Sequence, residues 1–170
     1  YAHTILAIYD LFSGKHDDAV HRLNRAKELD PNLSFACGYL GTTYAFSGDW
    51  ERARPHLEEA IKLSPRDPLL VVWHVCLGWA ALLSTHHEEA ATYALQAIQE
   101  NPNFADNYSV LAAAYGHLGR TADASGAREK LLRHMPDLTL DDSRLVRPFR
   151  NENDRQHFLD GLQKAGVPES

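Results

Sequence analysis

Four prolines divide most of the chain into segments of nearly equal length. They are Pro31, Pro65, Pro102 and Pro136, so the intervals between them are 34, 37 and 34 residues. The same three intervals recur in a column of alanines, namely Ala19, Ala53, Ala90 and Ala124. They recur again in a column of leucines, namely Leu6, Leu40, Leu77 and Leu111. Independent columns that share one spacing indicate a tandem array, which restricts the fold to a stack of similar units.

Each unit has the pattern of two helices. In the second unit, Cys37, Leu40 and Tyr44 fall on one helical face, and the sequence Ser-Gly-Asp at 47–49 predicts a turn after it. A second amphipathic segment follows and ends at the proline. Small residues such as Gly41 are expected to let the paired helices approach closely. No segment has the alternation of a strand, so the sequence predicts an all-α fold.

These units resemble tetratricopeptide repeats (TPRs). The second unit carries the resemblance best, through Leu40, Gly41, Tyr44, Ala53, Leu57, Ala60 and Pro65. The first unit is the weakest match, with Asp10 where tyrosine is usual. The resemblance implies a right-handed α-solenoid of four TPR units with C-terminal capping helices. The expected unit boundaries are about 1–33, 34–67, 68–104 and 105–136, followed by a capping segment at 137–170.

In such arrays the first helix of each unit lines a concave groove. The groove positions predicted here are Phe12, Phe35, Thr42, Phe46, Val72, Val75, Trp79, Leu83 and His117. This set is apolar and aromatic, and it lacks the cations with which some TPR domains hold a carboxylate. We therefore expect the partner to be a protein or peptide with apolar contacts, or a second copy of the chain. A segment upstream of this chain, or the chain's own tail, could cover the groove equally well in place of a partner.

The repeat ends at Pro136, and residues 137–170 do not follow its pattern. Their sequence predicts a short helix ending near Val146 and a longer one that Asn151 caps. Because the last pair of a solenoid exposes an apolar face, this segment is expected to act as a lid on the fourth unit. The side chains expected to dock there are Leu138, Leu140, Leu145, Phe149 and Phe158.

The tail also resembles the C-terminal ends of bacterial class III adenylate or guanylate cyclases that carry TPRs, and of related TPR-bearing transcriptional regulators. The resemblance includes Leu138, Thr139, Leu140, Arg144, Pro148, Phe149, Arg150, Gly161, Leu162, Lys164 and Gly166. It implies a role in signal transduction as the non-catalytic end of a longer protein. No catalytic residue is carried over.

Charge and composition exclude several classes of partner. The net charge is -6, and no run of Lys and Arg exceeds two residues, so neither nucleic acid nor an anionic membrane is an expected partner. The longest apolar run, at 69–83, has 15 residues and is too short to span a bilayer. Cys37 and Cys76 lie in apolar stretches, which predicts buried free thiols. Without a recognisable signal peptide, a cytoplasmic location is expected.

Catalytic and metal-binding patterns are missing from the sequence. The densest histidine segment is THHEEA at 85–90, where His86 and His87 are adjacent and would diverge on a helix. A zinc pair on one helix needs i, i+4 spacing, so no metal and no cofactor are predicted. No phosphate-binding glycine loop or nucleophile elbow occurs. The sequence therefore predicts a non-enzymatic scaffold for protein–protein interaction.

Overall fold

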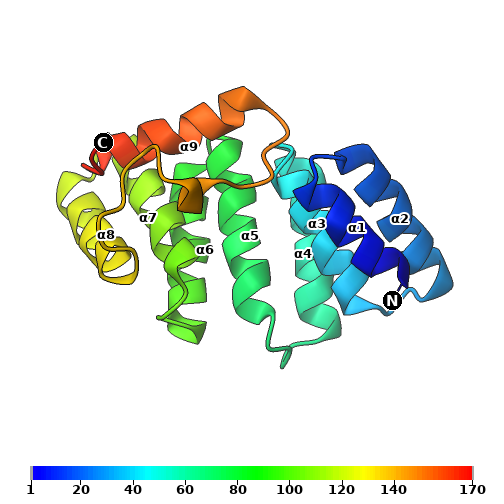
Figure 1. Cartoon of the computed structure of the whole chain (residues 1–170). Helices are drawn as coiled ribbons and strands as arrows, with labels where there is room; N and C mark the ends of the chain where they lie inside the picture. Colours follow the sequence, from blue (N-terminus) through cyan, green and yellow to red (C-terminus); the bar gives the residue numbers. More distant parts are fainter. Residues whose placement is uncertain (1, 170) are drawn as a thin grey trace.

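The computed structural model describes residues 2–169, and within this range every regular element is helical (Figure 1). The α-helices are α1 (Ala2–Phe12), α2 (His16–Leu29), α3 (Ser34–Ala45), α4 (Trp50–Leu63), α5 (Leu70–Leu83), α6 (His87–Glu100), α7 (Ala105–His117), α8 (Thr121–His134) and α9 (Glu152–Lys164). One 3₁₀ turn, η1 (Ser143–Leu145), precedes α9. The predicted all-α class is confirmed.

Helices α1 to α8 form four antiparallel pairs that stack side by side (Figure 1). The second helix of each pair also packs against the first helix of the next pair, and α1, α3, α5 and α7 form a continuous row. The turn within each pair has one residue with positive φ at the same place. These residues are Gly14, Gly48, Thr85 and Gly119, with φ values of 78°, 69°, 64° and 69°. The four pairs therefore share one turn geometry.

Small residues set the distance between the paired helices. A Cβ atom on Gly41 would lie 2.5 Å from Cγ of Leu57 and 2.9 Å from the carbonyl oxygen of Ala53. Contacts that short are repulsive, so α3 and α4 can pack this closely only with glycine on α3. The predicted close approach is confirmed.

The core runs through the whole stack and contains both cysteines. Cys37 and Cys76 are buried and unpaired, as the sequence predicted. Burial raises the pKa of the Cys76 thiol to about 12. The apolar run of the third unit becomes α5, in which Trp73 is fully buried. Within residues 2–169 no helix has the length and hydropathy that crossing a membrane requires.

Helix α9 packs mainly on α7 of the fourth pair, as predicted, but the rest of the tail extends beyond that pair. After α8 the chain turns back along the row of α7, α5 and α3, and α9 then returns over α5 and α7 (Figure 1). We call the face on which it lies the inner face, and residues 136–151 the crossing segment. The short helix expected near Val146 is reduced to the single turn η1, which Asp142 caps.

The prediction that Phe149 docks on the fourth unit is wrong. Its ring lies 5.9 Å from that of Phe46 and 5.7 Å from that of Trp79, in the second and third pairs. Phe158 also contacts Trp79, at 4.6 Å between ring centres. Phe149 follows Pro136 by 13 residues, which can span about 43 Å when extended, so the chain reaches the aromatic side chains of the inner face.

Candidate functional site

Polar contacts fasten the crossing segment to the first two helix pairs. Nε2 of His16 donates to the carbonyl oxygen of Pro148 at 2.8 Å. The guanidinium of Arg150 bonds both carboxylate oxygens of Asp17, at 2.8 and 3.0 Å, and lowers the pKa of that carboxyl. The backbone N–H of Arg150 donates to the carbonyl oxygen of Phe46 at 2.8 Å. That carbonyl lies at the C-terminal end of α3, where backbone C=O groups have no N–H partner within the helix.

The predicted groove residues differ widely in exposure. Buried are Thr42, Phe46, Val75, Trp79 and Leu83. Half-buried are Phe35, Val72 and His117, while Phe12 is exposed. Trp79 is only 1% exposed because Phe149 and Phe158 pack on it. The middle of the inner face is therefore covered by the chain's own tail, one of the occupants left open by the sequence.

Beside the crossing segment a cavity of about 300 Å³ remains open. We call it the apolar pocket. Its apolar lining consists of Phe12, Tyr39, Phe46, Val72, Val75, Trp79, Phe104 and Val146. At its polar edge Arg147 forms an ion pair with Asp106. Phe12 and Val146, on the rim, are 63% and 67% exposed, so an apolar ligand would meet them directly.

The rim continues along α1 as an apolar stripe. Ile5, Tyr9 and Phe12 follow one another at i, i+4 and i+7, and each is more than half exposed. Residues with this spacing share one face of a helix. The apolar pocket and this stripe, which we call the α1 stripe, thus form one surface.

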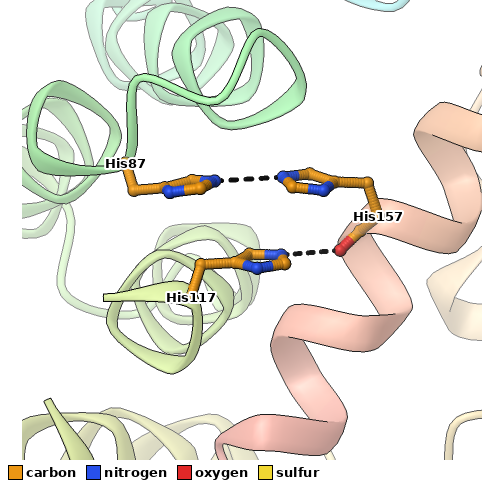
Figure 2. A group of neighbouring side chains, drawn as sticks. All are labelled: His87, His117 and His157. Carbon is orange, nitrogen blue, oxygen red and sulfur yellow. Dashed lines mark hydrogen bonds between the residues drawn. The ribbon is translucent and has the colours of Figure 1, made fainter. Parts of the chain in front are cut away.

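A second group of side chains lies at the N-terminal end of α6, at the C-terminal end of α7 and on α9. His87, His117 and His157 each place one ring nitrogen within 4.8 Å of those of the other two. Figure 2 shows Nε2 of His87 facing Nε2 of His157, at 3.1 Å, and Nε2 of His117 donating to the carbonyl oxygen of His157, at 2.8 Å. We call this group the three-histidine cluster. Its rings lie nearly parallel, with interplanar angles between 7° and 17°.

The surroundings of the cluster favour uncharged imidazoles. Burial, followed by the charges of His117 and His157, lowers the pKa of His87 to about 4. Burial is also the main cause that lowers the pKa of His117 and of His157. The Lys164 ammonium acts in the same direction, and Asp160 acts against it. The three rings are therefore neutral near pH 7, and each offers a lone pair.

Sequence reasoning missed the three-histidine cluster. It tested histidines for helical spacing within one segment, whereas these stand 40 and 70 residues apart. The neighbour His86 does not join them, since its ring packs against Trp50 at 5.6 Å. Only the route of the tail brings His157 to the other two, and no local pattern signals that route.

Comparison with known proteins agrees with the geometry of the helix pairs. Residues 34–67, which contain α3 and α4, match the tetratricopeptide repeat family. The fold is a TPR solenoid. No curated protein matches the sequence.

Solved TPR-like structures resemble most of the chain. A crystal structure of MamA has a TM-score of 0.67 at 23% identity and covers 94% of this chain and 91% of its own. MamA from Desulfovibrio magneticus RS-1 has a TM-score of 0.69 at 19% identity, with coverages of 97% and 95%. A mutant O-GlcNAc transferase from Thermobaculum terrenum has a TM-score of 0.70 at 21% identity, covering 78% of this chain and 25% of its own. At these identities the likeness establishes the TPR solenoid and nothing about activity.

Proposed function

We propose that the chain is a non-catalytic scaffold module that binds an apolar segment of a partner protein in the apolar pocket. One observation carries the proposal: the tail covers the centre of the inner face but leaves this pocket open. Exposed apolar surface costs free energy in water, and contiguous patches of it commonly mark interaction sites. The TPR solenoid supports the proposal because its row of first helices presents one continuous surface to a ligand.

The shape of the surface favours an amphipathic helix as the bound segment. At about 300 Å³ the apolar pocket is at the small end of ligand cavities, which suits one or two large apolar side chains. The α1 stripe extends this contact along a helical axis, as expected for helix-in-groove binding. The Asp106–Arg147 ion pair at the edge offers polar partners for the exposed side of such a helix.

The rim residue Phe12 gives the sharpest test. Phe12→Asp places a charge in the contact, and we expect it to weaken partner capture at least about 30-fold, the effect of losing a hot-spot residue. Leu29→Asp is the matched control, since Leu29 is 62% exposed and lies on α2 outside the pocket. Both variants should melt within a few degrees of the parent protein. Trp79→Ala is a poor probe because Trp79 belongs to the core.

Affinity capture with quantified partner bands measures the effect, and light scattering on a sizing column measures self-association. If the parent protein dimerises and Phe12→Asp is monomeric, the partner is a second copy. Equal loss of capture in the Phe12 and Leu29 variants, or no loss in either, would contradict the assignment of the pocket.

The likeness of the tail to TPR-bearing cyclases and transcriptional regulators stays a hypothesis about a longer parent protein. The residues that carry it have structural roles here, since Pro148, Phe149 and Arg150 fasten the crossing segment. The coding sequence upstream of this chain distinguishes the alternatives. Metal-binding carboxylates of a cyclase domain would favour the first, a winged helix would favour the second, and neither would favour a free scaffold. A cytoplasmic location likewise remains a prediction.

A further inference from the structure

We propose that His87, His117 and His157 form a zinc site, with one ring nitrogen from each histidine and a water molecule as the fourth ligand. No motif in the sequence indicates this site. It is independent of the apolar pocket, because none of the three side chains lines that cavity.

The distances suit zinc. Zn–N bonds of about 2.0–2.1 Å in a tetrahedral arrangement place the ligand nitrogens about 3.3 Å apart. The Nε2 atoms of His87 and His157 are already 3.1 Å apart. No two of the ligand nitrogens are more than 4.8 Å apart, so they need to approach by about 1.5 Å at most. The ring of His117 is stacked on those of His87 and His157, so it must also rotate until its lone pair, which lies in the ring plane, points at the ion.

The protons of the cluster also permit metal binding. In the metal-free protein one of the two facing Nε2 atoms carries the hydrogen that the other accepts. Transfer of that proton to Nδ1 of the same ring leaves both Nε2 lone pairs free and releases no net proton. Nε2 of His117 carries a hydrogen, which it donates to the backbone carbonyl oxygen of His157, so Nδ1 holds the lone pair that a metal would use.

The donor set selects the metal. Three imidazoles without a carboxylate or thiolate suit zinc, copper or nickel, and exclude calcium and magnesium, which need oxygen ligands. Three protein ligands with one open position occur in catalytic zinc sites, whereas structural zinc sites usually have four protein ligands. All three histidines are only half-buried, so the ion has access from solvent.

Two nearby charges act on a bound cation in opposite directions. Nζ of Lys164 lies 3.3 Å from Nδ1 of His117 and disfavours a cation there, while the Asp160 carboxylate favours it. Removing the ammonium in Lys164→Gln should therefore tighten zinc binding about threefold to tenfold.

The ligands come from three elements that are distant in the chain. His87 begins α6, His117 ends α7 and His157 lies on α9. A shared ion would join α9 to the third and fourth helix pairs, which adds a clamp to the packing of the tail. Zinc is thus expected to stabilise the docked tail in particular.

Calorimetry on the protein without a polyhistidine tag, titrated with zinc chloride, tests the site. We expect one ion per chain with a dissociation constant on the order of micromolar. His87→Ala and His157→Ala should each weaken binding more than about tenfold. His86→Ala is the matched control, since His86 is adjacent to the cluster but outside it, and should bind zinc like the parent protein.

Several outcomes would overturn the proposal: no zinc heat in the parent protein, undiminished affinity in the His87 and His157 variants, or an equal loss in His86→Ala. Far-UV circular dichroism checks that each variant retains its helices. Should His157→Ala unfold, His157→Gln and His87→Ala provide the same comparison.

The clamp is tested by heat and by hydrogen exchange. At free zinc about 100-fold above the dissociation constant, the melting temperature should rise by about 5–10 °C. Amide exchange should slow in α9 and stay unchanged in α2. Bound zinc that leaves the exchange of α9 unaltered would disprove the clamp.

Discussion

Thr85 has a φ of 64° at the turn position where the other three pairs have glycine. A β-branched residue is strained in this region because its side chain crowds the backbone. The conformation of Thr85 therefore costs stability, at the turn just before the three-histidine cluster begins at His87.

Replacing this residue should stabilise the fold. We expect Thr85→Gly to raise the free energy of unfolding by about 1 kcal/mol, measured by urea denaturation. Gly119→Ala is the converse control, since φ there is 69° and no atom lies within 4 Å of the added Cβ, so only backbone strain acts. It should lower the free energy of unfolding by about 1 kcal/mol. A destabilised Thr85→Gly would show that the hydroxyl or methyl of Thr85 has a role we have not assigned.

At the scale of elements, the packing of α9 on α7 depends on two glycines. A Cβ on Gly116 would overlap the carbonyl oxygen of Gly161, and one on Gly161 would lie 2.8 Å from that of Ala113. Backbone contacts this close allow no side chain, so α9 is fitted to α7 as closely as paired helices are to each other.

Substitution at this contact should loosen the tail. Gly161→Ala is expected to cost about 1–3 kcal/mol of stability through overpacking, and to shift tryptophan emission to the red as Trp79 becomes wetter. Gly126→Ala on α8, where nothing lies within 4 Å, is the matched control and should stabilise by up to about 1 kcal/mol. Equal, small effects of both substitutions would show that α9 is not held against α7.

The helices were predictable from sequence because their periodicity and turn residues are local signals. The predicted face of α3 is buried at Cys37, Leu40 and Gly41. The position of a residue in its helix was easier to predict than the hydrogen bonds of its side chain. Asn151 does precede α9 as its N-cap, yet its side chain bonds the Asp154 carboxylate instead of a backbone N–H.

The tail's partners could not be read in the same way. Phe149 meets Phe46, and Arg150 meets Asp17, across separations of 103 and 133 residues. Such contacts depend on which aromatic side chains remain uncovered after the helix pairs have stacked. The spacing of residues along the chain does not predict which ones these are. The three-histidine cluster follows from the same route and was missed for the same reason.

At the scale of the whole molecule, the tail joins the two ends of the stack. Its contacts extend from α2 through the crossing segment to α7 and α8. A solenoid is usually stabilised between neighbouring units alone, so a strap across several units should raise the cooperativity of unfolding. The tail also leaves the apolar pocket beside it open, which is the observation behind the proposed function.

The exchange rate of the Arg150 amide shows whether the tail is docked on the inner face, on which the proposed function depends. The amide lies in an irregular segment, and its partner is the carbonyl oxygen of Phe46, 104 residues earlier in the chain. If the tail is docked, the amide should exchange at least about 100-fold more slowly than in an unstructured chain. Exchange near the unstructured rate, while the amides of α5 remain protected, would show that the tail leaves the inner face open.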